Sequence, residues 1–295
     1  MIRGNHETLL RIGLPKGSLQ DSTIDLFKRA GYHIRVSERS YFPEIDDPQL
    51  SCVMFRAQEM SRYVEDGVVD LGITGRDWIA ENGSDVQEVS ELCYSKATSR
   101  PTRWVLAVPE ESPVQTPQEL GGGIIATELV NTTRRYFAER GIDVKVEFSW
   151  GATEVKARLV DAIVDITETG SSIKANNLRV IDQLMTSTTR LIANHDSWKD
   201  PLKRDKIESL ALLLRGALDA RGLVGLKMNV AADRLPEILR MLPAEKSPTI
   251  SPLADGGWSA LEIIVEEHVE RELVPRLHRA GATGIFSYPL NKVIH

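Results

Sequence analysis

Two acids and a run of hydroxyl side chains in residues 151–179 are the groups best suited to chemistry. Asp161 and Asp165 lie four residues apart in an apolar, β-branched run, so the two-residue period of a strand puts both on one face. The small and hydroxyl-bearing residues 167–172 follow directly and lead into a helix that starts at Ile173. Carboxylates in front of such a turn suit the vicinal hydroxyls of a sugar or a divalent metal ion.

The turn itself has the character of an anion site. Gly170 lets the backbone approach a ligand, hydroxyls and free N–H groups point at it, and the helix dipole favours negative charge by roughly 0.3–1 kcal/mol. Together with the acids, the turn predicts a site for a phosphorylated ribose. A plain helix start with Ser171 or Ser172 as its N-cap explains the same residues, and their spacing alone leaves both interpretations open.

A second turn of this kind lies near the N-terminus. Residues 9–14 are predicted as a short buried strand, Lys16 and Gly17 follow it, and residues 21–30 are predicted as a helix that ends at Gly31. A strand, a glycine turn and a helix give the same anion geometry, here with a lysine in it. The alternative is an ordinary βα turn with a solvated lysine.

Three more predicted strands carry polar groups toward one edge. Arg56 ends the first strand, Asp70 leads through the second into Thr74 and Gly75, and Glu128 ends the third. These strands cover residues 51–55, 68–73 and 123–128. Open α/β sheets bind ligands at the carboxyl ends of their strands, so we expect a cleft lined by these groups.

The length, the net charge and the numbers of cysteine and histidine residues argue against several classes of protein. A chain of 295 residues suits two or three domains, and its formal charge of −6 argues against a general nucleic-acid binder. Two cysteines form no CxxC pair and six histidines show no metal-binding spacing, so neither a structural zinc nor a disulfide framework is expected. No apolar stretch reaches the length of a membrane span and no signal peptide is apparent, which predicts a cytoplasmic protein.

The order of elements predicts an α/β protein with two lobes around a cleft, as in periplasmic binding proteins, followed by a separate module. Lobe I is expected in residues 1–98 and 180–206, and lobe II in residues 99–179. Two crossings between the lobes would create a hinge. Residues 207–295 then follow the order β-α-β-β-α-β, which is typical of ferredoxin-like, ACT-like modules that bind small regulatory ligands.

Four segments resemble one enzyme family. DITETGSSI (165–173) resembles the phosphoribosyl-diphosphate loop of the ATP phosphoribosyltransferases, and LPKGSL (14–19) and FRAQEMSRYVEDGVVDLGITG (55–75) resemble their nucleotide side. KSPTISPLADGGW (246–258) resembles the regulatory domain of the family's long form. The resemblance runs from Leu9 to the end of the chain. It implies transfer of the phosphoribosyl group of 5-phosphoribosyl 1-diphosphate to N1 of ATP, the first step of histidine biosynthesis, with Mg²⁺ carried in by the substrate.

The resemblance also implies roles for single residues. The expected catalytic residues are Lys16, Arg56, Asp161 and Asp165. The residues expected to bind phosphoribosyl diphosphate are Asp161, Asp165, Thr167, Glu168, Thr169, Gly170, Ser171 and Ser172. Those expected to border the nucleotide are Lys16, Gly17, Asp70, Thr74, Gly75 and Glu128. No general base is expected, because N1 of adenine carries no proton at neutral pH, and catalysis should come from positioning and electrostatics. The loop between Glu154 and Asp161 is shorter than in many relatives, which leaves the role of Glu154 open.

The third module has no acid cluster, phosphate turn or nucleophile, and the long form of the family is inhibited by histidine. Matching segments place Asn229, Thr249, Ile264 and Gly284 at the expected histidine site. An aspartate is expected at position 229, so the asparagine here should weaken binding by roughly 1–2 kcal/mol. A module that only holds subunits together is the alternative, and the family suggests dimers and hexamers.

A solute-binding or sensor protein with the same two lobes is the rival from another class. Such a protein would not require carboxylates aimed at ribose hydroxyls, so the Asp161–Ser172 segment favours the enzyme.

Overall fold

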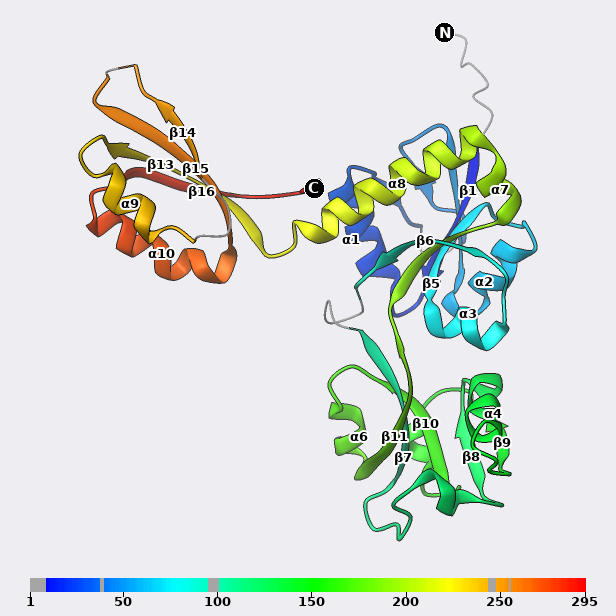
Figure 1. Ribbon diagram of the computed structural model, residues 1–295. Coiled ribbons are helices and arrows are strands. Elements are labelled where there is room, and N and C mark those ends of the chain that lie inside the picture. The colour runs from blue at the N-terminus through cyan, green and yellow to red at the C-terminus, as the bar shows by residue number, and fades with distance from the viewer. Residues whose placement is uncertain (1–8, 38–39, 95–100, 244–247, 255) are drawn as a thin grey trace. The chain divides into compact units, whose positions relative to one another are not determined.

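The computed structural model describes residues 9–37, 40–94, 101–243, 248–254 and 256–295. The chain forms two compact units, Met1–Leu214 and Arg215–His295. The first unit consists of two α/β lobes, each built on its own five-stranded sheet. This confirms the predicted periplasmic-binding-protein-like architecture (Figure 1).

The sheet of lobe I has the strand order β4-β1-β5-β12-β6. Its strands are β1 (Leu10–Lys16), β4 (Leu50–Arg56), β5 (Leu71–Gly75), β6 (Gln87–Leu92) and β12 (Thr189–Ala193). Strands β1, β4 and β5 are parallel, whereas β12 runs antiparallel to both neighbours. The carboxyl ends of β1, β4 and β5 therefore lie at one edge, as the sequence predicted.

Helices α1 (Gln20–Ala30), α2 (Ala57–Glu65) and α3 (Arg76–Asn82) follow these three parallel strands. Helix α1 buries Leu26 and Phe27 against the sheet. It ends at Gly31, as predicted, with a φ of 101° that an L side chain rarely adopts. A short hairpin, β2 (Ile34–Arg35) and β3 (Glu44–Ile45), connects α1 to β4.

The sheet of lobe II has the order β11-β7-β10-β8-β9. Its strands are β7 (Thr102–Pro109), β8 (Ile124–Thr127), β9 (Lys145–Phe148), β10 (Ala162–Thr167) and β11 (Leu178–Ser187). Alternate residues of β7 enter two different cores: Trp104, Leu106 and Val108 pack with Phe137, whereas Val105 and Ala107 pack with Ile173. The helical elements are η1 (Pro117–Leu120), α4 (Val130–Ala138), α5 (Thr153–Lys156) and α6 (Ser171–Ala175).

Two predicted boundaries are wrong. Lobe II does not end at residue 179, because β11 stays in the second sheet to Ser187 before the chain returns to lobe I in β12. The boundary predicted between residues 206 and 207 falls inside α8 (Pro201–Asp219), which follows α7 (His195–Lys199), and the two units divide after Leu214. Asn194 caps α7 by accepting from the backbone N–H groups of Asp196 and Ser197, which is how this polar sequence becomes helical.

The second unit has the predicted β-α-β-β-α-β order. Its elements are β13 (Leu223–Ala231), α9 (Leu235–Met241), β14 (Thr249–Pro252), β15 (Trp258–Glu266), α10 (Glu267–Arg279) and β16 (Thr283–Pro289). The strands pair antiparallel in the order β14-β15-β13-β16, the ferredoxin-like arrangement. Leu226, Met228 and Leu261 form its core with residues of α9 and α10. The expected turn at 254–257 includes Asp255, which lies outside the described residues.

Among the described residues, no helix combines the length and the apolar character needed to cross a membrane.

Candidate active site

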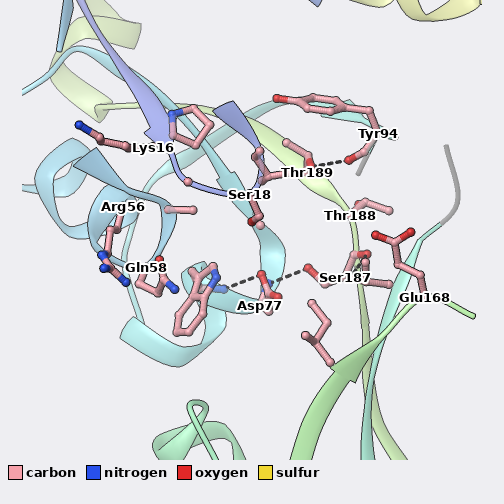
Figure 2. A pocket seen from close by; sticks show the side chains of 18 of the residues that line it. Lys16, Ser18, Arg56, Gln58, Asp77, Tyr94, Glu168, Ser187, Thr188 and Thr189 are labelled. Atoms are coloured by element: carbon pink, nitrogen blue, oxygen red, sulfur yellow. Dashed lines mark hydrogen bonds between the residues drawn. The ribbon is translucent and has the colours of Figure 1, made fainter. Parts of the chain in front are cut away.

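A cavity of about 1220 Å³ is lined by residues of both lobes. Lobe I contributes Pro15–Leu19 after β1, Phe55–Glu59 at the start of α2, and Gly75 after β5. Lobe II contributes residues 166–169 and 171–172 after β10, and the crossing residues Ser187–Thr189 complete the wall. Figure 2 shows Lys16 and Arg56 on one side of this pocket and Glu168 on the other.

The lobe I wall is cationic where the sequence predicted it to be. The ammonium of Lys16 lies 3.7 Å from the centroid of the Tyr41 ring, which holds the long side chain at the pocket. Gly17 has a φ of +102°, and a Cβ placed on it would meet no atom within 4 Å, so its backbone is open to a ligand. Arg56 occupies the N-cap position of α2 at the end of β4.

The predicted loop after β10 forms the opposite wall. Thr167 is buried, and its hydroxyl oxygen accepts from the backbone N–H of Gly170 at 2.8 Å. The Thr169 hydroxyl donates to Ser171 Oγ at 3.0 Å. Gly170 has a φ of +82° with no atom within 4 Å of its Cβ position, so the turn depends on glycine for its conformation and not for space. The structure therefore brings Thr167, Thr169, Ser171 and their neighbours to the same pocket as Lys16 and Arg56.

Three carboxyl groups of lobe II, those of Asp165, Glu154 and Glu128, interact electrostatically near this loop, although none of the three residues is in the lining of the cavity. Burial raises the pKa of Asp165 to about 7, opposed by the N–H of Ile166, and the carboxylates of Glu154 and Glu128 raise it further. Burial also raises the pKa of Glu128, opposed by a hydrogen bond from Gln58 and by the charge of Arg56. Glu128 is thus held next to lobe I, and Glu154, whose role the sequence left open, hydrogen-bonds to Asp165.

Asp161 is not part of this group, contrary to the expectation. It precedes β10, whereas the loop follows the other end of the strand, and its carboxylate accepts from the backbone N–H of Ile124 at 2.8 Å. The period of two correctly gives one face to Asp161 and Asp165. The period does not say at which end of the strand each aspartate lies. At a rise of about 3.3 Å per residue, the four residues from Asp161 to Asp165 span about 13 Å along β10.

Asp70 and Thr74 also lie apart from the pocket lining. Asp70 precedes β5, at the amino end, where its carboxylate accepts from the Arg11 N–H at 2.7 Å and from Lys203 Nζ at 2.6 Å. Thr74 is fully buried, and its hydroxyl donates to the carbonyl of Ala57 at 2.7 Å. Both residues hold lobe I together, and of the DLGITG segment only Gly75 lines the pocket.

Several pocket residues were not predicted from the sequence. Gln58 lies in the first turn of α2, Asp77 and Trp78 lie in that of α3, and Ser187 and Thr188 connect β11 to β12. The signal that could have found Asp77 is its place directly after the glycine turn at the end of β5, where an acid in the first turn of a helix is favourable. Cys93, expected to be buried, is only partly buried and also lines the pocket.

The four residues expected to contact histidine lie in the second unit, on the side of its sheet that faces away from the core. Asn229 pairs with Ala260, Thr249 with Glu262, and Ile264 with Gly225, so their side chains share the face opposite Leu226 and Met228. Gly284 has a φ of +56°, and a Cβ on it would lie 3.2 Å from Asn229 Nδ2. The absence of a side chain at position 284 therefore leaves Asn229 accessible.

No group of three or more His, Cys, Asp or Glu side chains that could hold a metal ion occurs among the described residues.

Two family models and two similar proteins that match this chain carry the name of one enzyme family. Residues 56–216 match the family model described as "ATP phosphoribosyltransferase", and residues 220–292 match "HisG, C-terminal domain". The chain is 58% identical over 287 residues to an ATP phosphoribosyltransferase of Prosthecochloris aestuarii, covering 97% of this chain and 98% of that protein. A counterpart of Solidesulfovibrio magneticus is 55% identical over 290 residues, with 98% and 99% covered.

A solved structure is similar as well. The ATP phosphoribosyl transferase (HisG:HisZ) complex of Thermotoga maritima contains a chain that is 29% identical, with a TM-score of 0.60. The match covers 70% of this chain and 96% of that one.

Proposed function

Because the chain belongs to the ATP phosphoribosyltransferase family, in its long form, we propose that the interlobe pocket binds the two substrates of that reaction on opposite walls. The chain transfers the phosphoribosyl group of 5-phosphoribosyl 1-diphosphate to N1 of ATP and releases diphosphate, the first step of histidine biosynthesis. The observation that carries the arrangement of the site is the single cavity shared by Lys16, Arg56 and the Thr167–Ser172 loop.

The phosphoribosyl half-site lies on lobe II. The 5-phosphate binds the loop Thr167–Ser172, whose hydroxyl-bearing residues line the pocket and whose Gly170 has open space at its Cβ position. Asp165 accepts hydrogen bonds from the ribose hydroxyls once it is ionised, and Glu154 beside it tunes that ionisation. Asp161 has no part in this site, because it binds Ile124 at the other end of β10.

The nucleotide half-site lies on lobe I. Lys16, Gly17, Arg56 and Gly75 line the pocket at the ends of β1, β4 and β5, and the charge of Arg56 acts on the carboxyl group of Glu128. Lys16 and Arg56 supply positive charge to the triphosphate and to the diphosphate. We assign Asp70 and Thr74 to the stability of lobe I and not to substrate binding, because their polar atoms bind protein groups.

In the reaction, the C1–oxygen bond to diphosphate breaks while a bond from adenine N1 to C1 forms. C1 gains oxocarbenium character and the leaving diphosphate gains charge. The chain positions the two substrates and supplies cations where that charge develops, so no group needs to remove a proton from N1. Mg²⁺ entering with the diphosphate would neutralise part of this charge, and Glu168 is the loop carboxylate on the pocket wall that would hold it.

We assign regulation to the second unit. Histidine binds the sheet face that carries Asn229, Thr249, Ile264 and Gly284 and lowers turnover by feedback inhibition. We also propose that the enzyme works in the cytoplasm as a homo-oligomer, a dimer or a hexamer, as its family suggests. Domain roles follow this division: lobes I and II bind substrates, and residues from Arg215 onward respond to the effector.

Incubating the protein with ATP, phosphoribosyl diphosphate and Mg²⁺ tests the proposal. Diphosphate release that requires both substrates and yields the N1 adduct is expected. Release that is independent of ATP, or binding without turnover, would instead support a solute-binding or sensor protein.

A further inference from the structure

Helix α3 of lobe I presents two buried carboxylates to lobe II. Asp77 and Glu81 lie one helical turn apart, and the two residues are 3% and 8% exposed. Carboxylates are almost never this buried unless they are paired or hydrogen-bonded. Both of these accept hydrogen bonds from residues of lobe II.

Glu81 caps a helix of the other lobe. Its Oε1 accepts from the backbone N–H of Asn131 and its Oε2 from that of Thr132, both at 2.8 Å. These two N–H groups belong to the first turn of α4, whose own N-cap residue, Leu129, provides no side-chain hydrogen bond. A side chain of lobe I therefore accepts hydrogen bonds from backbone N–H groups of α4 that have no acceptor within their own helix.

Two more bonds run between the same helices. Asn131 Nδ2 donates to the Glu81 carbonyl at 3.1 Å, and Arg135 donates to the Ala80 carbonyl at 2.5 Å. The last turn of α3 and the first turn of α4 are thus joined by both backbone and side-chain groups.

Asp77 makes the second connection. Its Oδ2 accepts from Trp104 Nε1 at 2.7 Å, and its backbone N–H donates to the Ser187 hydroxyl at 3.1 Å. Trp104 lies on β7 and packs edge to face against Trp78, with ring centroids 6.2 Å apart. Figure 2 shows Asp77 and Ser187 joined at the pocket wall.

We propose that Asp77 and Glu81 are positioning residues that hold the two lobes at the separation required for reaction. The inference rests on the proposed half-sites, with the nucleotide on lobe I and the phosphoribosyl group on lobe II. Glu128, which precedes the capped helix, is held next to Arg56 by the same connection. Two-lobed proteins of this fold can rotate about their crossing strands, and α3 opposes that rotation by binding lobe II outside the crossings.

The connection affects turnover more than the binding of either substrate. Most of the contacts proposed for each substrate come from one lobe, and only the diphosphate reaches from the lobe II loop to the cations of lobe I. A change in lobe separation therefore changes single-substrate binding less than it misplaces N1 relative to C1. A misplacement of about 1 Å costs on the order of 100-fold in rate.

Two variants remove different parts of the connection. Glu81→Gln replaces one acceptor oxygen by an NH₂ group, which cannot accept from the α4 backbone. Arg135→Ala removes the bond to Ala80 and leaves the cap of α4 in place. The matched controls are Arg134→Ala, at the exposed neighbouring position, and Glu139→Gln, at the opposite end of α4.

The full-length variants are compared by steady-state kinetics, by calorimetry with ATP and with phosphoribosyl diphosphate separately, and by amide hydrogen exchange. Glu81→Gln should lower kcat by about 10- to 100-fold, and each dissociation constant should change less than about twofold. Exchange at Asn131 and Thr132 should quicken. Arg135→Ala should lower kcat in the same direction but less, and both controls should keep wild-type values.

Unchanged kcat in Glu81→Gln, with only a lower melting temperature, would show that the cap merely stabilises α4 and would overturn the proposal. Loss of binding of a single substrate would overturn it as well, because Glu81 would then act within one half-site. Absence of turnover in the unmodified protein would instead contradict the proposed function.

Discussion

Glu154 on α5 and Asp165 on β10 share a hydrogen bond between their carboxyl groups, two residues before the loop that starts at Thr167. Burial raises the pKa of Asp165 to about 7, and the nearby carboxyl group of Glu154 adds to the rise because two close carboxyl groups do not both ionise easily. The charge of Asp165 therefore changes near neutral pH.

We expect the affinity for phosphoribosyl diphosphate to increase as the pH rises through about 7, because ionised Asp165 accepts better from ribose hydroxyls. Glu154→Gln removes a like charge, so the midpoint should move to lower pH by about one unit. Calorimetric titrations between pH 5.5 and 8.5 give the two profiles. Glu147→Gln, an exposed change in the same lobe, controls for titration of the substrate itself. Superimposable profiles would exclude this role of Glu154.

The same shift has a consequence for stability. The folded pKa of Asp165 is raised above its ordinary value of 3.8, so its stabilising effect is complete below about pH 4 and is lost as the pH rises through about 7. Asp165→Asn should accordingly raise the melting temperature at pH 8 and leave it unchanged near pH 4.

Gly170→Ala should weaken binding of phosphoribosyl diphosphate because the turn needs a φ of +82°. The left-handed region costs an L residue roughly 1–2 kcal/mol, which corresponds to a 5- to 30-fold loss if the loop relaxes to another conformation. Gly122→Ala is the matched control, with a φ of +78° and open space around it, but in the turn that follows η1 and not in the loop after β10. Calorimetry and thermal melts distinguish the two. Equal affinity in both variants would make the loop a plain helix start.

Lys16→Ala and Arg56→Ala should each lower kcat by about 100-fold while the melting temperature changes little, since the cations act where charge develops. Arg56 is exposed, so its removal leaves no buried partner unpaired in lobe I. Lys145→Ala, a surface ion-pair lysine of lobe II, serves as the control. Normal turnover in either variant would remove that residue from the mechanism.

Asp70→Asn should reduce stability and spare turnover. Burial alone would raise the pKa of Asp70, but Lys203, the Arg11 N–H and Ser197 outweigh it and lower the pKa from 3.8. Its contribution is thus present above about pH 4 and is lost as the pH falls through the lowered pKa. The side chain is 18% exposed, so we expect a loss of about 2–3 kcal/mol in the free energy of unfolding at pH 7.

Urea denaturation at pH 7 and at about pH 3 measures this difference in the free energy of unfolding, which should shrink at the lower pH. Asp66→Asn, an exposed change nearby, should have no effect. A fall in turnover at unchanged stability would restore Asp70 to the nucleotide site.

Asn229→Asp should strengthen inhibition by histidine. A charge-assisted hydrogen bond to the ammonium group adds roughly 1–2 kcal/mol, or about 5- to 30-fold in the inhibition constant. Asn229→Ala should weaken inhibition, whereas Ser287→Ala, on the core-facing side of β16, is the control. Histidine titrations of turnover decide the matter. No inhibition at millimolar histidine in the unmodified chain and in Asn229→Asp would favour a module that only joins subunits.

The sequence alone was enough to predict several residues of the pocket and the elements of the second unit. Lys16, Gly17, Arg56 and the loop around Gly170 follow strands directly, so a residue's place at the end of its own strand sufficed to bring it to the pocket. The alternating pattern of the second unit likewise predicted its six elements in the correct order.

Tertiary structure decided which end of a strand and which partner each polar residue has. The two-residue period of a strand puts Asp161 and Asp165 on the same face. Only Asp165 lies near the loop, because Asp161 is at the other end of β10, where it accepts a hydrogen bond from Ile124 of β8. From the sequence, Asp70 was expected to border the nucleotide. In the structure its carboxylate forms an ion pair with Lys203, which lies far from it in the sequence. The cap that Glu81 provides to α4 joins residues 50 apart in sequence. No periodicity or spacing encodes such a contact, since it exists only once both lobes have folded and come together.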